Sequence, residues 1–397
     1  MTRDEMYDAC VQALTKSNCL LLEAATGTGK TLQSIKLVNW ISKAAYKNHN
    51  PKMLLLVAKR VHKQTWSDEF QKWGGISADV TMECYESLHK HTGEHFDFII
   101  ADEVHHIGSE ARMQQLKTMK YGYMIGLSAT IPQKLKMWFK YNFHSETVSC
   151  DITQAIDSEV LPTPTILLLP LEVENTRQSE TIELNPKAKG PVFHGEYAKD
   201  HWRCKKQKIH AVLKCTQKQK LMELDKLIEW YKKKTMMGNL AMKQTWLYFC
   251  GKRLEFLADC KMQWVKLILH HLDKERTITF CKTISQTEQL GENCIHSQNK
   301  DAVKVYDDFN NKKIDHITAV NILNENANLV DCKYAVFANL SSSEVVIPQR
   351  LGRAMRHKSP VIIMPYYKDT REQEIVEKML EGFNKDYIKT IKSVSEI

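Results

Sequence analysis

A glycine-rich run near the start of the chain has the residue types of a phosphate-binding loop: Ala24-Ala25-Thr26-Gly27-Thr28-Gly29-Lys30-Thr31. Glycines allow backbone N–H groups to curl around phosphate oxygens, and a helix that begins there adds a favourable field. Lys30 would then reach the β and γ phosphates, and the hydroxyl of Thr31 would bind Mg²⁺. The sequence therefore predicts a nucleotide site formed by Thr26, Gly27, Thr28, Gly29, Lys30 and Thr31.

Two adjacent carboxylates, Asp102 and Glu103, follow the apolar run 96–101. In an open α/β sheet, the carboxyl ends of strands are the expected place for catalytic groups. Phosphoryl transfer depends on charge neutralisation and positioning, so Asp102 could hold Mg²⁺ and Glu103 could orient and deprotonate an attacking water. We predict that both carboxylates are catalytic, together with Lys30.

Two further segments could contribute to the same chemistry. Ser128-Ala129-Thr130 follows a short apolar run, and the segment from Gln349 to Arg356 reads QRLGRAMR. If this segment is helical, Arg353 and Arg356 share one face and could reach phosphate charge across a cleft. Taken alone, the segment would more simply be a basic helix face.

Short apolar runs without polar alternation are typical of parallel strands that are covered on both faces. One group of runs comprises 19–25, 53–58, 80–85, 96–101 and 123–127, with helices predicted at 31–43 and 61–73. A second group comprises 165–171, 276–281, 317–322, 334–340 and 361–365, and a final helix is predicted from Thr370 onward, through Tyr387. The alternation of strands and helices predicts an α/β fold with two lobes.

The charge of the chain is concentrated in one region. The 397 residues are 43% hydrophobic and 26% charged, which excludes a mainly disordered or fibrous chain. Of the net charge of +9, the stretch Thr176–His270 carries +11, from 20 Lys and Arg against 9 Asp and Glu, which leaves −2 for the remainder. We predict lobe 1 at 1–158 and a lobe 2 made of 159–175 and 275–397, with a basic, mainly helical insertion within lobe 2 at 176–274.

The clustered lysines of this insertion are predicted to contact a nucleic acid, because the lobes carry no charge excess to hold a polyanion. These lysines are Lys205, Lys206, Lys232, Lys233 and Lys234. The aromatic residues among them are expected mainly to form the insertion's own core, since a small helical unit needs such side chains to bury. They are Trp202, Trp230, Tyr231, Trp246 and Trp264.

In order and spacing, these segments resemble the motifs of the superfamily 2 helicases of the DEAD/DEAH type. The matching pieces are AATGTGKT (motif I), DEVH (motif II), SAT (motif III) and QRLGRAMR (motif VI). The segment from Val57 to Phe70, the run YESL at 85–88, and DEVHH followed by IGLSAT are similar to type III restriction motors and phage recombination helicases.

The resemblance implies two RecA-like P-loop lobes, with ATP and Mg²⁺ between them and nucleic acid across both. It implies that Arg353 and Arg356 are finger and sensor arginines, and that Gln349 approaches the γ-phosphate or its water. It also implies that Ser128 and Thr130 couple hydrolysis to lobe movement, and that Lys59 and Arg60 of the motif Ia region bind nucleic acid.

Three positions depart from the family pattern. The family usually has Gln where Met6 stands, and more often has Gly and Asp where Asn326 and Asn328 stand. The preference for ATP and the coupling through motif V are therefore left open.

We expect a DNA helicase or translocase driven by ATP hydrolysis, with DNA favoured over RNA by analogy with its branch. Three alternatives remain: an ATP-gated nucleic-acid clamp, the motor subunit of a larger restriction or recombination complex, and an RNA helicase. Any replication, recombination or nuclease partner is unknown.

The protein is expected in the cytoplasm, without a membrane partner, since the start of the chain lacks a secretory signal and no apolar run could span a bilayer. A phage origin would place it in the host cytoplasm. The eleven scattered cysteines are expected to be buried free thiols, and the cluster His201, Cys204, His210 and Cys215 lacks the spacing of familiar zinc sites.

Overall fold

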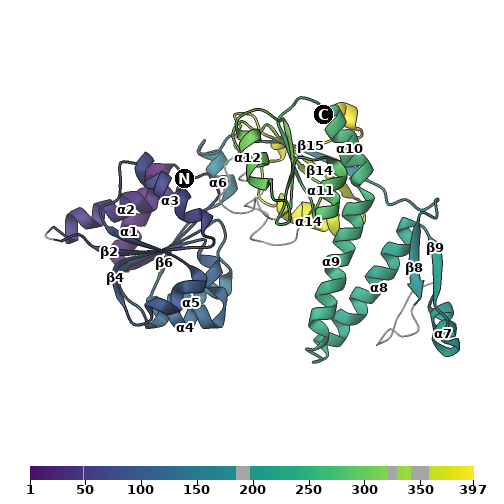
Figure 1. The fold of residues 1–397 in the computed structure, drawn as a ribbon, viewed down its shortest axis with the longest axis horizontal. Coiled ribbons are helices and arrows are strands. Elements are labelled where there is room, and N and C mark those ends of the chain that lie inside the picture. Colours follow the sequence, from purple (N-terminus) through teal and green to yellow (C-terminus); the bar gives the residue numbers. More distant parts are fainter. Residues whose placement is uncertain (48, 185–196, 321–328, 341–356) are drawn as a thin grey trace.

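The computed structural model describes residues 1–47, 49–184, 197–320, 329–340 and 357–397. They form two α/β lobes, and an arm that extends from the second lobe (Figure 1). This bears out the predicted fold class of two lobes with parallel sheets.

Sheet A, within the described residues, has the strand order β3-β2-β4-β5-β1-β6, and all neighbouring strands are parallel. Its strands are β1 (Cys19–Ala24), β2 (Lys52–Val57), β3 (Asp79–Cys84), β4 (His95–Asp102), β5 (Lys120–Ser128) and β6 (Glu146–Cys150). Its helices are α1 (Arg3–Lys16), α2 (Lys30–Ala45), α3 (Val61–Lys72), α4 (Glu110–Thr118), α5 (Gln133–Phe143) and α6 (Ile152–Asp157), with 3₁₀ turns η1 (Tyr85–His91) and η2 (Val104–Gly108).

The unbroken apolar runs of these strands arise because both faces of sheet A are covered. Side chains alternate between the faces of a strand, so Leu20 and Leu22 of β1 pack with α1 to α3, whereas Leu21 packs with α4 and α5. All three leucines are fully buried. Helices on both faces leave the sheet's carboxyl edge as the place where loops can form a site.

Sheet B of the described residues has the order β11-β12-β10-β13-β14-β7-β15, again with parallel neighbours. Its strands are β7 (Thr165–Leu171), β10 (Thr277–Phe280), β11 (Cys294–Ile295), β12 (His316–Ala319), β13 (Tyr334–Phe337), β14 (Val361–Tyr367) and β15 (Ile388–Thr390). The surrounding helices are α10 (Met262–His271), α11 (Ile284–Leu290), α12 (Ala302–Asn310) and α14 (Arg371–Met379), with 3₁₀ turns η5 (Lys385–Tyr387) and η6 (Val394–Glu396).

The arm comprises β8 (Glu180–Leu184), α7 (Ala198–Gln207), β9 (Ala211–Cys215), α8 (Gln217–Met236) and α9 (Met242–Cys260). It is mainly helical, as predicted, but β8 and β9 form an antiparallel pair that the sequence did not indicate. Figure 1 shows α8 and α9 as a long hairpin that projects away from sheet B.

The C-terminal segment differs from the prediction of one long final helix. The helix α14 buries Ile375 and Met379 but ends at Met379, and Gly382 then turns the chain with a φ of 86°. Tyr387 lies in η5, and β15 adds an edge strand beside β7. The helical spacing of apolar side chains continues beyond Gly382, although the helix itself ends before it. Glycine adopts this positive φ readily, so the chain turns there.

Within the part of the chain that the structure describes, no helix is long and apolar enough to cross a membrane.

Candidate functional site at the carboxyl edge of sheet A

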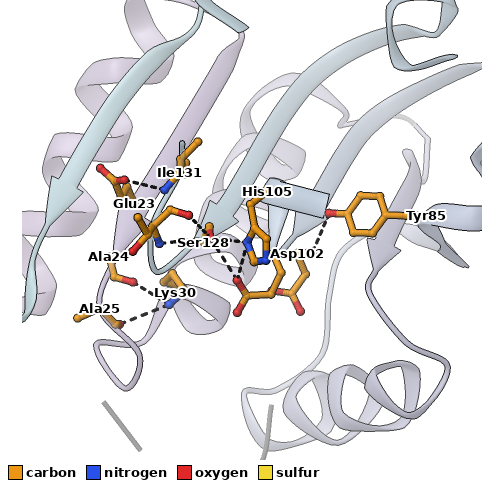
Figure 2. Close-up of polar contacts among 11 residues, drawn as sticks. Glu23, Ala24, Ala25, Lys30, Tyr85, Asp102, His105, Ser128 and Ile131 are labelled. Atoms are coloured by element: carbon orange, nitrogen blue, oxygen red, sulfur yellow. Dashed lines mark hydrogen bonds and ion pairs between the residues drawn. The ribbon is translucent and has the colours of Figure 1, made fainter. Parts of the chain in front are cut away.

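The predicted motifs I, II and III follow three neighbouring strands. In the register of sheet A, Glu23 of β1 lies beside Ser128 of β5, and Asp102 of β4 lies beside Leu127. Because β5 is between β1 and β4, the loops that follow all three strands meet at one edge. Figure 2 shows Lys30, Asp102 and Ser128 gathered there.

The glycine-rich loop has the backbone conformation that its sequence predicts. Gly27 and Gly29 have φ values of 96° and 101°, which L-residues with side chains rarely adopt. Gly29 is the N-cap of α2, so the loop leads directly into a helix N-terminus. Thr28 is fully buried, and its hydroxyl donates to the carbonyl of Ala25 at 2.8 Å. The loop is thus held in a curled form that can turn N–H groups toward an anion.

The ammonium group of Lys30 lies over this loop. Its Nζ donates to the carbonyl oxygen of Ala24 at 2.7 Å and of Ala25 at 3.4 Å (Figure 2). The helix α1 is tied to the same loop, because Arg3 Nε donates to the carbonyl of Thr28 at 3.2 Å. Thr26 and Thr31 are half-buried beside these groups. The six residues predicted to bind nucleotide therefore form one continuous loop and first helical turn.

Asp102, the last residue of β4, has its position set by two aromatic residues. The indole Nε1 of Trp66, on α3, donates to Asp102 Oδ2 at 2.9 Å, and both side chains are buried. The hydroxyl of Tyr85 donates to the backbone carbonyl of Asp102 at 2.6 Å. Burial, followed by the negative charges of Asp102 and Glu103, raises the pKa of Tyr85 well above its usual value, so the phenol stays a donor.

Glu103 adopts a left-handed backbone conformation, with φ 52° and ψ 55°. This conformation is costly for a residue with a side chain, and such strain is concentrated at functional sites. The carboxylate is only 6% exposed, and its Oε2 accepts from Ser128 Oγ at 3.2 Å and lies 3.4 Å from His105 Nδ1. Ser128 and His105 therefore hold the Glu103 carboxylate at the turn between β4 and η2.

Ser128 lies at the centre of a small polar network. Its Oγ is 3.2 Å from Glu103 Oε2, 2.8 Å from the carbonyl oxygen of Thr130 and 3.0 Å from His105 Nδ1. A hydroxyl has a single proton, so it donates either to Glu103 or to the Thr130 carbonyl. Ser128 thus contacts the predicted water-activating carboxylate directly, and Thr130 is connected to that carboxylate through Ser128.

Glu23 is a site residue that the sequence prediction missed. It accepts the backbone N–H of Ile131 at 2.7 Å and pairs with Lys136 Nζ at 2.5 Å. These contacts tie the segment after motif III to the strand before the glycine-rich loop. The available signal was a carboxylate within the otherwise apolar strand β1, one residue before Ala24.

Trp66, Tyr85 and His105 were also given no role, although all three occur within the segments that resemble helicase motifs. Their contacts with Asp102, Glu103 and Ser128 depend on how α3, η1 and η2 fold over the edge of sheet A.

The residues predicted to bind nucleic acid lie on three separate segments of the chain. Lys59 and Arg60 are exposed between β2 and α3. Lys205 and Lys206 are exposed on α7, whereas Lys232, Lys233 and Lys234 are exposed near the end of α8. Of the aromatic residues expected in the arm's core, Tyr231 is buried and Trp202 is 65% exposed.

Gln349, Arg353 and Arg356, like Asn326 and Asn328 of motif V, lie outside the described residues. The backbone of His201 is described but its side chain is not. His210 Nε2 bonds to Glu183 Oε1 at 2.7 Å, while Cys204 and Cys215 are buried with Ile182 and Leu184. Those two thiols therefore serve as packing groups of the β8–β9 unit.

Two family models match the chain. The model described as "Type III restriction enzyme, res subunit" matches residues 3–92 and 77–133, and "Helicase conserved C-terminal domain" matches residues 260–358. The first match contains motifs I and II, and the second contains the segment from Gln349 to Arg356. No curated protein matches the chain.

Two solved structures show the same fold at low identity. S. cerevisiae Dbp5 bound to RNA and ADP BeF3 is 11% identical, with a TM-score of 0.59 over 98% of this chain and 89% of that chain. The ATP-dependent Type ISP restriction-modification enzyme LlaBIII bound to DNA is 14% identical, with a TM-score of 0.58 over 99% of this chain and 31% of that chain.

The two family matches, on the two lobes of this fold, support a superfamily 2 helicase with ATP-hydrolysing domains. These matches agree with the motifs in indicating a nucleic-acid helicase that hydrolyses ATP.

Proposed function

We propose that this chain is an ATP-dependent helicase or translocase of DNA, with hydrolysis in the cleft between lobe 1 (1–158) and lobe 2 (159–175 and 275–397). The insertion 176–274 would contact the nucleic acid. The observation that supports the proposal best is the meeting of Lys30, Asp102, Glu103 and Ser128 at one edge of sheet A.

In this proposal, the ammonium group of Lys30 leaves the carbonyl oxygens of Ala24 and Ala25 when ATP binds and contacts its β and γ phosphates instead. Thr31 and Asp102 offer the oxygen ligands that Mg²⁺ prefers, and the ion would neutralise phosphate charge. Glu103, hydrogen-bonded by Ser128, would orient the attacking water and accept its proton. The resemblance assigns the remaining charge to Arg353 and Arg356, with Gln349 near the γ-phosphate or its water.

Lys59 and Arg60 would contact the nucleic-acid strand from lobe 1. Their loop leads into α3, the helix whose Trp66 bonds to Asp102. A strand bound at Lys59 and Arg60 would therefore act on the same helix that orients the predicted Mg²⁺ ligand. This link supports an ATPase that responds to nucleic acid.

DNA is favoured by the match to a restriction-enzyme model. A motor subunit of a larger restriction assembly is the second candidate, because the chain spans only 31% of the length of LlaBIII. Because Dbp5 has a similar fold and is bound to RNA, RNA is included among the substrates to be tested.

The deciding experiment measures ATP hydrolysis with duplex DNA, single-stranded DNA, forked DNA and RNA side by side. Stimulation by one or more of the DNAs, stronger than by RNA, is expected. Equal rates with all four and with no nucleic acid would exclude a motor. DNA binding that depends on ATP, without strand displacement or translocation, would instead identify a clamp.

A substitution tests the assignment of Glu103. Glu103→Gln should abolish turnover while ATP still binds, because the amide cannot accept the water's proton. Glu110→Gln, at an exposed carboxylate on α4, is the matched control and should leave turnover unchanged. Undiminished hydrolysis by Glu103→Gln would refute the role.

A further inference from the structure

The turn between α8 and α9 presents three apolar side chains to solvent. Met236, Met237 and Leu240 are 72%, 74% and 74% exposed. Figure 1 shows this turn at the end of the hairpin that lies farthest from sheet B. We call these three residues the apolar tip.

The apolar tip has an ordered backbone. Gly238 has a φ of 94° after the last residues of α8, its N–H donates to the carbonyl of Thr235 at 3.1 Å, and the N–H of Asn239 donates to that of Lys234 at 3.2 Å. This is the pattern of a Schellman turn, which ends a helix in a defined conformation. The three side chains are thus displayed on a fixed turn.

The hairpin that carries the apolar tip is braced along its length. Between α8 and α9, the rings of Tyr231 and Phe249 stack with centroids 5.3 Å apart, and Arg253 Nη1 pairs with Asp225 Oδ1 at 2.5 Å. At its root, the buried Lys261 pairs with Glu372 of lobe 2 at 2.6 Å. A movement of lobe 2 would therefore be carried to the apolar tip.

The charge around the apolar tip has one sign. Residues 230–254 contain six Lys and Arg and neither Asp nor Glu. Lys252 and Arg253, farther along α9, pair with Glu255 and Asp225. In the described part of the chain, no carboxylate pairs with Lys232, Lys233 or Lys243. The ligand of this surface should therefore be a polyanion that also offers an apolar face.

A nucleic-acid junction has both properties, because its phosphates surround base pairs with exposed faces. An anionic lipid surface shares the charge, but helices that lie on lipid carry a continuous apolar face along their length. Here Leu247 and Tyr248 of α9 are also exposed, but the exposed polar residues Lys243 and Gln244 separate them from Leu240. Resting on the proposed function, we infer that the apolar tip contacts the terminal base pair where a duplex opens into single strands. Lys232, Lys233 and Lys243 contact its flanking phosphates.

The test uses forked DNA with a fluorescent adenine analogue at the last base pair before the fork. Wild-type protein should raise its fluorescence on binding by unstacking the base. The triple variant Met236→Ser, Met237→Ser, Leu240→Ser should lower this rise and the rate of strand separation by about tenfold, as expected for the loss of base contacts. ATP hydrolysis stimulated by single-stranded DNA should stay unchanged.

The matched control is Val303→Ser, at a residue of α12 that is 72% exposed and far from the arm in sequence. It should behave as wild type. An unchanged fluorescence rise and separation rate in the triple variant would overturn the inference, even with intact DNA-stimulated hydrolysis. Loss of binding to phosphatidylserine–phosphatidylcholine vesicles in that variant, with forked DNA unaffected, would assign the tip to a lipid surface instead. Absence of any DNA-stimulated hydrolysis in the wild type would defeat the proposed function itself.

Discussion

The indole of Trp66 donates a hydrogen bond of 2.9 Å to Oδ2 of Asp102, and both side chains are buried. Trp66 lies on α3, which begins directly after the exposed Lys59 and Arg60. Asp102 is the last residue of β4. The bond holds one oxygen of this carboxylate in a fixed orientation. The hydrogen bond therefore joins the helix that follows the predicted nucleic-acid-binding residues to the predicted Mg²⁺ ligand.

Replacement of Trp66 by Phe should weaken the response to Mg²⁺. The ring would still fill the core, but Asp102 would lose the donor that orients it, and partners behind a metal ligand are typically worth about 10–100-fold in metal affinity or activity. We expect the Mg²⁺ concentration for half-maximal ATP hydrolysis to rise by about tenfold. Trp73→Phe is the control, because Trp73 also donates to a carboxylate, that of Glu69, but at an exposed position. Equal Mg²⁺ curves for both variants would contradict a positioning role.

Loss of the Ser128 hydroxyl should uncouple hydrolysis from movement. The hydroxyl lies within hydrogen-bond distance of both Glu103 and the Thr130 carbonyl, so Ser128→Ala removes the connection without removing the carboxylate. We expect strand separation to fall by about tenfold more than ATP hydrolysis, the scale of a coupling free energy between sites. Ser145→Ala is the control, since the Ser145 hydroxyl is buried without a hydrogen-bond partner. A parallel decline of both activities in Ser128→Ala would argue against coupling.

The buried pair of Lys261 and Glu372 should stabilise the attachment of the arm. Lys261 is 0% exposed, and its Nζ also donates to the carbonyl of Pro365 at 3.1 Å. Lys261→Met leaves a buried carboxylate without its cation, which costs about 3–5 kcal/mol. Urea unfolding followed by circular dichroism should show this loss.

Two further variants separate the charge from the packing around Lys261. The double variant Lys261→Met, Glu372→Gln should recover part of the loss, because no unpaired charge remains. Lys312→Met, which breaks an exposed pair with Asp331, should move the unfolding midpoint much less. A loss no larger than that of Lys312→Met would contradict the assignment.

The lysine cluster on α8 should contribute to the salt dependence of DNA binding. Each phosphate contact adds about 0.9 to the slope of log affinity against log salt concentration, so removing three should lower its magnitude by about 2–3. Lys232→Gln, Lys233→Gln, Lys234→Gln is the test. Lys312→Gln, Lys313→Gln is the control, because both lysines already pair with acids. Unchanged affinity and slope would exclude the cluster from binding.

Alkaline pH should destabilise the fold through its buried thiols. All eleven cysteines are described and free, and nine are buried. Burial raises the pKa of Cys10, Cys19, Cys260 and Cys332 from about 9 to about 12. Below the unfolded pKa, these thiols are neutral in both states, and their contribution to stability is complete. As the pH rises from about 9 toward 12, only the unfolded chain ionises, so the free energy of unfolding should fall.

Thermal unfolding at several pH values in this window checks the expected decline. Alkylation of the native protein near neutral pH provides the second readout, in which the half-buried Cys84 and Cys250 should react before the nine buried thiols. A flat stability profile above about pH 9 would contradict the burial of these thiols.

The local chemistry and most of the strands could be predicted from the residues alone. Apolar runs such as 19–25 and 96–101 predicted strands covered on both faces, and the glycines at 27 and 29 predicted a loop that could curl around phosphate. The structure has β1, β4 and such a loop before α2 at these places. Asp102 and Glu103 were recognisable because carboxylates at the end of such a strand lie at the sheet's functional edge.

Which side chains support those residues depends on the three-dimensional arrangement of the elements. Trp66 donates a hydrogen bond to Asp102, and Glu23 accepts one from the backbone N–H of Ile131. Both bonds depend on the strand order of sheet A. No local periodicity encodes that order, because it results from long-range packing of strands and helices. The same reason explains the β8–β9 pair and the apolar tip, whose exposure is set by how α8 and α9 pack together rather than by composition.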